Sequence, residues 1–350
     1  MDTSDLDHIA DVDQAAPDPG HVDALARLQR AHLARTRPVD APPGPDAVRR
    51  TLGAMANLRS FDVRTGLACS GGRVVGQAVT SSSRKDDNQH LLQVEAFVDE
   101  PHRRRGVGAR LLRWALARAR AEGRTLLIGT TTDRDPAGEA FAQRLGARVG
   151  LRSLVFELGV DAVDAGQLAG WLRAGPERAP DVELAWLGSP YPDDTLEGLA
   201  AVMRAMNDIP LGDLQVTDRT VTPATLRDLD AARRRRGDER WTLVARRRAD
   251  GVLVGATETL WDPGNPAVLV QLGTMVLREA RGHGIGRWLK AAMLERVLRE
   301  RPKLRVVRTD SASMNAPMRA INDALGFRLA LTETVWQVGV EEAAGALDAA

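Results

Sequence analysis

Polar and apolar residues follow two periods along this chain, one of about two residues and one of three to four, which predicts strands interleaved with helices. In the stretch 106–121, Leu111, Leu112, Ala115 and Leu116 fall on one helical stripe, and the pattern stops before Gly123. The first half of the chain is predicted to form helices over 22–35, 46–58, 106–121 and 136–144, and strands over 61–69, 73–81, 90–98, 125–130 and 148–158.

The second half repeats this order of elements. It is predicted to form strands over 182–186, 240–247, 252–260, 268–277, 303–309 and 327–338, and helices over 193–206, 223–235, 284–299 and 316–325. The same short glycine-containing motifs recur at a nearly constant offset: Val75-Gly76 corresponds to Val254-Gly255, and Leu145-Gly146 corresponds to Leu325-Gly326. The chain is therefore an internal repeat.

Helices that alternate with strands in both halves predict an α/β (α+β) fold built twice, each copy a mixed central sheet flanked by helices. We expect a poorly ordered lead-in over 1–20, an N-terminal domain over 21–159, a linker with a short helix over 160–180, and a C-terminal domain over 181–350. A length of 350 residues agrees with two domains.

Composition narrows the classes of function. The 48 basic and 47 acidic residues give a net charge of +1, which favours neither nucleic acid nor an anionic membrane as partner. The single cysteine, Cys69, fits a reducing cytoplasm, and no apolar run approaches the roughly 20 residues of a membrane span. The start of the chain is acidic and lacks the pattern of a signal peptide, and the histidines show no metal-binding spacing. We expect a cytoplasmic protein without a metal; the oligomeric state stays open.

Two short loops carry the clearest candidate chemistry. The pattern R-x-x-G-x-G occurs once per half, starting at Arg103 and at Arg281, and each copy lies between a predicted strand and a predicted helix. The first N–H groups of a helix have no partner within the helix, so such a loop is suited to bind an anion, and the arginine side chain is able to bind phosphate oxygens. A nucleotide-triphosphate loop is excluded because no Gly-Lys-Ser/Thr follows, and the dinucleotide spacing is absent.

At these loops the sequence resembles the GNAT superfamily of acetyl-CoA-dependent N-acetyltransferases. The signature of that family, Val-x-Pro-x-x-Arg/Gln-x-x-Gly-x-Gly/Ala, is similar to Val98-Asp99-Glu100-Pro101 with its following loop and to the stretch from Val276 to Gly286. The closing Leu-Gly-Phe appears at Leu325, and Asn315 precedes the last helix of the second half. The resemblance covers both halves and is closest to tandem GNAT proteins, the group that includes mycothiol synthase.

The resemblance implies where acetyl-CoA binds as cosubstrate. The pyrophosphate would lie on the Gly-containing loop, the pantetheine along the end of the preceding strand, and a backbone N–H there would polarise the acetyl carbonyl. The residues implied in the second half are Met275, Val276, Leu277, Arg281, Gly282, His283, Gly284, Ile285, Gly286 and Asn315. Their counterparts in the first half are Phe97, Val98, Arg103, Arg104, Arg105, Gly106, Val107 and Gly108.

Direct acyl transfer needs a base for the amine and an acid for the leaving thiolate. Members of the family often supply the acid from a tyrosine five residues before the Phe of Leu-Gly-Phe, but this sequence has Asn322 there and Ala142 in the first half. For the base, Glu258 lies on the strand before the signature strand, and Asp310 lies at the C-terminal end of the predicted strand 303–309. The structural alternatives are a solvated strand residue for Glu258 and a turn residue for Asp310.

The second half has the more complete set of motifs, so we assign catalysis to it, with the first half either binding CoA or bracing the acceptor site. The function expected is an acetyl-CoA-dependent N-acetyltransferase acting on the amine of a small molecule. The alternatives are acetylation like that of mycothiol synthase or of a protein N-terminus, and a non-catalytic acyl-CoA-binding sensor.

Overall fold

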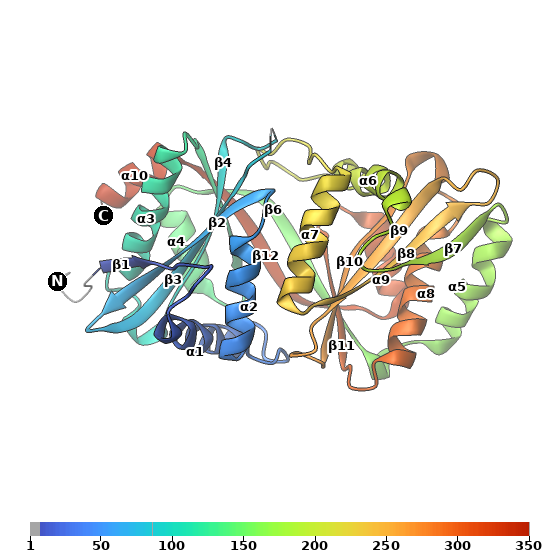
Figure 1. Ribbon diagram of the computed structural model, residues 1–350, viewed down its shortest axis with the longest axis horizontal. Coiled ribbons are helices and arrows are strands. Elements are labelled where there is room, and N and C mark those ends of the chain that lie inside the picture. Colours follow the sequence, from blue (N-terminus) through green and yellow to red (C-terminus); the bar gives the residue numbers. More distant parts are fainter. Residues whose placement is uncertain (1–7, 86, 350) are drawn as a thin grey trace. The chain divides into compact units, whose positions relative to one another are not determined.

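The chain folds into two compact units, which are described here from a computed structural model covering residues 8–85 and 87–349 (Figure 1). The first unit contains residues up to Arg152, the segment Leu211–Asp218 and the C-terminal stretch from Thr332. The second contains Ser153–Pro210 and Arg219–Leu331. Each unit is a mixed α/β structure, as the hydrophobic pattern predicts.

The first unit is a six-stranded sheet with helices on both faces, in the strand order β1-β2-β3-β4-β5-β12. Its elements are β1 (His8–Asp11), α1 (Pro19–Thr36), α2 (Pro45–Ala56), β2 (Phe61–Ser70), β3 (Arg73–Ser83), β4 (Leu91–Val98), η1 (Glu100–His102), α3 (Val107–Ala121), β5 (Leu126–Thr132), α4 (Pro136–Arg144), β12 (Arg328–Gly339) and α10 (Val340–Asp348). Neighbouring strands are antiparallel except β4 and β5, which are parallel.

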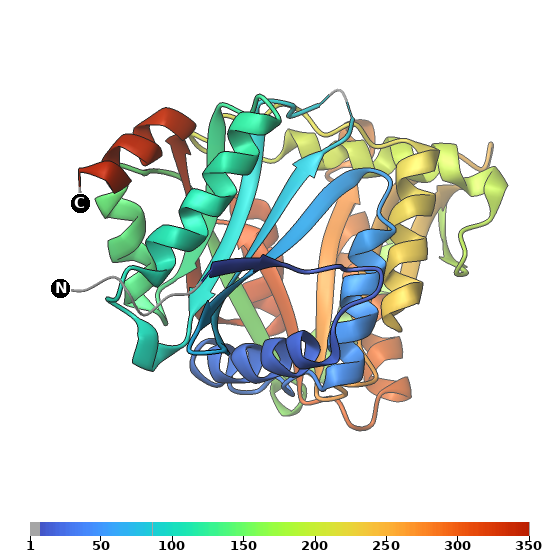
Figure 2. The ribbon, with the colours of Figure 1, turned by 60° about the vertical axis from the view of Figure 1, so that its left-hand side comes forward.

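Alternation along β2 decides which helices cover which face of this sheet. Leu67 and Cys69 pack with α1 and α2, whereas Ala68 packs with α3. The other flank of α3 packs against α10, and the two helices lie side by side in Figure 2, teal and red. The amphipathic stripe predicted from Leu111 to Leu116 is buried in these contacts.

The second unit repeats the architecture with the strand order β6-β11-β10-β9-β8-β7. Its elements are β6 (Arg148–Gly159), η2 (Val160–Ala162), α5 (Ala165–Arg178), β7 (Val182–Leu187), η3 (Asp193–Thr195), α6 (Leu196–Arg204), η4 (Ala205–Asp208), α7 (Pro223–Arg236), β8 (Glu239–Arg247), β9 (Leu253–Trp261), β10 (Val268–Val276), η5 (Arg278–Ala280), α8 (Ile285–Glu300), β11 (Val306–Ala312) and α9 (Ala316–Leu325). Here β10 and β11 form the parallel pair.

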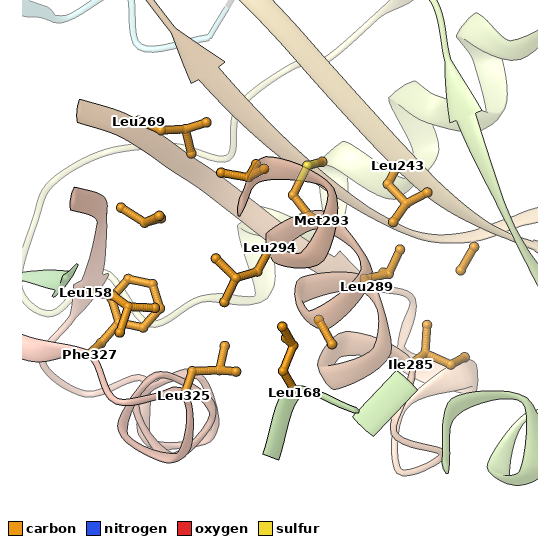
Figure 3. Packing of buried hydrophobic residues seen from close by; sticks show 14 of the residues in the cluster. Leu158, Leu168, Leu243, Leu269, Ile285, Leu289, Met293, Leu294, Leu325 and Phe327 are labelled. Atoms are coloured by element: carbon orange, nitrogen blue, oxygen red, sulfur yellow. The ribbon is translucent and has the colours of Figure 1, made fainter. Parts of the chain in front are cut away.

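Two cores hold the second unit together. On one face of the sheet, Leu289, Met293 and Leu294 of α8 pack with Leu269 and Phe327 (Figure 3). On the other face, α6 and α7 bury Leu199, Leu226 and Met275. The helices therefore hold β9 and β10 from both sides, and side chains on these strands reach one helical layer or the other according to their alternation.

Each repeat donates its last strand to the sheet of the other unit. Ser153–Gly159 of β6 comes from the first repeat but pairs with β11, from Ser153↔Ala312 to Gly159↔Val306. Conversely, Glu333–Gly339 of β12 comes from the second repeat but pairs with β5. The chain segment 211–218 likewise belongs to the first unit, where Thr217 and Asn88 exchange hydrogen bonds. The domain boundaries at 159 and 181 stay predictions. Because of the exchange, a cut at these boundaries would leave each sheet without one of its strands.

The structure differs from the expected elements at the two ends. A poorly ordered lead-in was expected over 1–20, yet β1 pairs with β2, Val12 is buried, and Gln14 donates to Thr65 (3.1 Å); residues 1–7 lie outside the described residues. Helix α10 was not predicted, because its sequence is short and rich in alanine. Its apolar face is recognisable only from its packing against α3. Among the described residues, no helix is long and apolar enough to cross a membrane.

Candidate active site

Both R-x-x-G-x-G loops adopt the same backbone conformation. In the second unit the φ angles of Gly282 and Gly284 are +88° and +77°, and in the first unit those of Arg104 and Gly106 are +63° and +79°. The left-handed conformation favours glycine, so the first loop tolerates strain at Arg104 that the second avoids. Neither Gly106 nor Gly284 caps the helix that follows with a side chain, so the first N–H groups of α3 and α8 are left to face an anion.

The arginines that begin these loops are engaged with the protein itself. The Arg281 guanidinium donates to the Val276 carbonyl (2.9 Å) and to Asp208 (2.6 Å). Arg103 donates to the Val98 carbonyl (3.1 Å) and to both carboxylate oxygens of Asp135 (2.9 and 2.7 Å). In this structure both guanidinium groups hold the loop against the end of its strand, and the binding of phosphate by these arginines stays a prediction.

The parallel strands of the second unit separate beyond a short paired region. Pairing between β10 and β11 runs from Val268↔Val306 to Val270↔Arg308, while both strands continue further. On its other side β10 pairs with β9 up to Val276, with a bulge between Gln271 and Thr274. The open edge of β10 beyond Val270 therefore offers backbone groups to an extended ligand, and the bulge turns backbone groups out of the ladder.

The first unit has the splayed strands but not the bulge. Pairing of β4 with β5 covers Leu91 to Gln93, and β4 pairs with β3 in an unbroken register from Ser81↔Gln93 to Gly76↔Val98. Beyond the paired region, Asp135 at the start of α4 accepts a hydrogen bond from Arg103, which lies in the loop after β4. Asp135 also accepts a hydrogen bond from Arg35 (3.2 Å). Burial alone would raise the pKa of Asp135, but hydrogen bonds and charge from Arg103 and Arg35 hold it below its usual value.

Glu258 lies in a buried polar network on the α6–α7 side of the second sheet. It is 6% exposed and accepts hydrogen bonds from Tyr191 and from Thr242 (2.8 Å). Arg240 lies 3.4 Å from the same carboxylate and also binds Asp230 (2.7 Å). On β9, Thr257 pairs with Thr274 and Thr259 with Gln271, so Glu258 lies level with the bulge.

Tyr191 is the functional candidate that sequence reasoning did not place. It lies in the loop between β7 and η3, 67 residues before Glu258 in sequence, and only the packing of that loop against β8 and β9 brings the two together. Burial, and then the negative charge of Glu258, raises the pKa of the Tyr191 phenol above its ordinary value. The phenol therefore stays protonated and donates to the carboxylate.

Comparison with known proteins decides the family. A model of the acetyltransferase (GNAT) family matches residues 30–147. A tandem GNAT protein from the clavulanic acid biosynthesis pathway, solved without AcCoA, is 30% identical with a TM-score of 0.80, over 95% of this chain and 99% of its own. The chain belongs to the GNAT family. It is an acyltransferase with the tandem arrangement that its repeat indicates.

More distant GNAT structures share the fold. A GCN5-related N-acetyltransferase from Sphaerobacter thermophilus is 16% identical with a TM-score of 0.63, over 95% of this chain and 96% of its own. The glucosamine N-acetyltransferase region of a fungal multi-domain β-N-acetylglucosaminidase is 13% identical with a TM-score of 0.67, over 95% of this chain and 38% of its own. No curated protein matches the sequence.

The other predicted site residues of this GNAT protein take up distinct places. Asp310 is exposed on β11 beyond the splay, opposite Val155 of β6. Asn315 caps α9 by accepting from the Met318 N–H (3.3 Å). Met275 is buried against α6 and α7. In the first unit, Phe97 stacks on His32 of α1, with the centres of the two rings 5.0 Å apart. The remaining predicted cofactor residues lie in the two loops and at the adjoining strand ends, and nothing tests their contact with a ligand.

The second GNAT unit leaves unpaired the backbone groups that an acyl-CoA, the cosubstrate of this family, would need. An uncapped helix start follows the left-handed turn at Gly284, and the open edge of β10 leads from it to the bulge. Among the described residues, no group of three His, Cys, Asp or Glu side chains is placed to hold a metal.

Proposed function

We propose that this protein transfers an acetyl group from acetyl-CoA to the amine of a small molecule, and that the second unit performs the reaction. The observation that carries this proposal is the bulge of β10 beside its unpaired edge, since β4 in the first unit keeps a regular register. The similar tandem GNAT protein comes from a biosynthesis pathway of a small molecule, which supports a small acceptor.

The geometry of the second unit supports a direct transfer. The N–H groups of the first turn of α8 would bind the pyrophosphate, and the edge of β10 from Gln271 to Val276 would pair with the amides of the pantetheine arm. A backbone N–H at the bulge would then face the carbonyl oxygen on which negative charge develops. Binding and polarisation thus come from backbone groups that the fold holds in place.

Glu258 is our proposed base for the acceptor amine. Its carboxylate lies level with the bulge and on the α6–α7 side of the sheet, and Arg240 with Arg233 (3.9 Å) provides positive charge beside it. The contact with Tyr191 offers a path for the proton, because the phenol both donates to Glu258 and contacts Thr242 (3.3 Å). Asp310 is the second candidate, exposed on the other strand of the splay.

For the first unit we propose a bracing role. Its strand β4 keeps an unbroken register with β3, so this unit lacks the bulge that would polarise the acetyl carbonyl. The acceptors of the alternative functions, a cysteinyl amine or a protein N-terminus, would use the same site in the second unit. A sensor without turnover would bind acetyl-CoA there but transfer nothing.

The proposal predicts the effect of a carboxylate placed in each loop, measured by calorimetric titration with acetyl-CoA. Gly284→Glu should abolish binding, because its carboxylate would meet the pyrophosphate at the start of α8. Gly106→Glu is a matched control, since Gly106 has almost the same φ, +79° against +77°, and thus the same backbone strain. Loss of binding in Gly106→Glu alone would place the site in the first unit, and no binding by the wild type would refute the acetyl-CoA proposal.

A further inference from the structure

Lys290 of α8 is a buried cation outside the network of Glu258. Its side chain is 2% exposed, and its Nζ donates to the Oδ1 of Asn322 on α9 and lies 3.7 Å from the Sδ of Met318. Nζ also lies 5.4 Å from the centre of the Phe327 ring. Burial lowers the pKa of this ammonium from 10.5 to about 7, although the negative charge of Asp310 on β11 acts in the opposite direction.

The contacts of α8 place Lys290 level with the bulge of β10. Near its start, Gly286 faces Val276, since a Cβ added there would lie 3.8 Å from the Val276 Cγ2. Further along, Met293 accepts from Thr259 (3.5 Å), and Thr259 pairs with Gln271. Lys290 lies between these two contacts, so its position along β10 falls between Val276 and Gln271.

From α8 the Lys290 side chain extends towards α9, where Nζ donates to Asn322, and it is close enough to β11 for the charge of Asp310 to act on it. It therefore lies on the side of the splayed strands that α8 and α9 cover. Glu258 lies at the same level on the opposite, α6–α7 side of the sheet. A reacting centre at the bulge would have the carboxylate on one side and the ammonium on the other.

The internal repeat shows that the fold does not need this polar pair. With offsets of 178 and 180 residues, Lys290 corresponds to Leu112 and Asn322 to Ala142. Leu112 is buried among apolar side chains, including Leu145 and Phe141, and Ala142 is also buried. The second unit instead buries an ammonium together with an amide whose Nδ2 has no hydrogen-bond partner among the described residues. Such a substitution costs stability, which points to a chemical role.

We propose that the Lys290 ammonium donates a proton to the thiolate that leaves acetyl-CoA, with Asn322 as the residue that positions it. This inference rests on the proposed acetyl transfer in the second unit. It supplies an acid where the position five residues before Phe327 holds Asn322 in place of a tyrosine.

The acceptor amine nitrogen forms a bond to the acetyl carbonyl carbon, the carbon–sulfur bond breaks, and sulfur takes the electron pair. The sulfur then receives a proton from Lys290, which becomes a neutral amine, while the proton lost by the acceptor amine passes to Glu258. Solvent returns a proton to Lys290 and removes one from Glu258, so the products are the amide and the CoA thiol. Asp310 favours the charged form of Lys290 before the next turnover.

The test uses the product, CoA, and reads its thiolate by ultraviolet absorbance as pH is raised. In complex with the wild type, the bound thiol should ionise at a pH about one unit lower than in complex with Lys290→Leu. The two groups titrate as a pair, because the ammonium close to sulfur stabilises the thiolate and the thiolate in turn raises the pKa of Lys290 above about 7. Lys290→Leu introduces the residue that the first unit has at this position. Lys303→Met is the matched control, since Lys303 is exposed and should leave the titration unchanged.

Two further readings keep the outcomes distinct. Calorimetry must first show that CoA binds the wild type and Lys290→Leu alike; absence of binding to the wild type would refute the proposed function instead. If CoA binds both and the thiol ionises at the same pH in both, Lys290 is not beside the sulfur and the inference is overturned. If Lys290→Leu does not fold, Asn322→Ala replaces it, and a thiol titration unchanged in Asn322→Ala also overturns the inference.

Discussion

Asp230 is 2% exposed and accepts hydrogen bonds from Ser189 (3.1 Å), Arg234 (3.1 Å) and Arg240 (2.7 Å). The Arg240 guanidinium also stacks 3.4 Å from the centre of the Tyr191 ring. These contacts hold Arg240 between two carboxylates, so that removing either would leave a buried guanidinium partly uncompensated. Residues that share such a network act together, and substitutions in it need a measurement of folding beside one of activity.

Glu258→Gln should lower kcat at least tenfold, a loss of about 1.4 kcal/mol of transition-state stabilisation, because the amide keeps the volume but cannot accept a proton. Tyr191→Phe should lower kcat less, since the carboxylate keeps its contact with Thr242. Thiol release with a panel of small amines measures both. If Asp310→Asn has the larger effect while Glu258→Gln stays active, the base is Asp310. Denaturation by urea checks that each variant is folded.

Lys290 also predicts how stability depends on pH. Its pKa of about 7 in the folded protein lies below the ordinary 10.5, so the unfolded chain binds more protons between these values. Stability contributed by this residue therefore rises as pH increases from 7 towards 10. Lys290→Leu should be more stable than the wild type at pH 7, and the difference in the free energy of unfolding should shrink at pH 9.5. A difference that stays constant would show that Lys290 does not titrate in this range.

At the scale of elements, the two units differ more in the bulge of β10 than in their helices. Both units have the parallel pair, the short η turn and the uncapped helix start, but of the corresponding strands β4 and β10 it is β10 that breaks its register with the preceding strand. Gly273 lies within this bulge, and a Cβ added there would lie 2.7 Å from the Met275 Sδ. The strand therefore holds its backbone close to two methionine side chains, Met275 and Met206.

Gly273→Ala should reduce kcat several-fold with little loss of acetyl-CoA affinity. The added methyl group would lie 2.7 Å from the Met275 sulfur, so this methionine side chain has to move beside the bulge, whereas the start of α8 is several residues away. Steady-state kinetics with calorimetry measures the two effects. Ala96→Val, on the regular β4, is the control and should change neither. An unaltered kcat in Gly273→Ala would show that the bulge takes no part in the reaction.

At the scale of the whole molecule, neither half of the chain contains a complete sheet. Residues 1–159 lack β12, whose Glu333–Gly339 segment pairs with β5, and α10, which packs against α3. Residues 160–350 lack β6, the partner of β11. An exposed strand edge over an unfilled core is destabilising and favours aggregation.

The two halves produced separately, as 1–159 and 160–350, should each fail to give a cooperative thermal transition. Mixed during refolding, they should recover one, because each supplies the strand that the other lacks. Circular dichroism during heating measures this, with the intact chain as reference. Cooperative unfolding of both isolated halves would show that the exchanged strands are dispensable.

Sequence alone determined the repeat, the order of its elements and the two anion loops, because these depend on local periods and on glycine at left-handed turns such as Gly284. It also selected Glu258 and Asp310 as candidate bases, a choice that stays a prediction. The exchange of β6 and β12 could not be read from it, because both strands have the same alternating pattern and either sheet would accept either strand.

Only the tertiary structure decided which side chains meet. Tyr191 reaches Glu258, and Lys290 reaches Asn322, through contacts between elements that are distant in sequence. Burial then changes the chemistry of these groups, since removal from water raises the pKa of a phenol and lowers that of an ammonium. The sequence thus predicted the fold and its loops, whereas packing determined the candidate acid, Lys290, and the surroundings of the proposed base, Glu258.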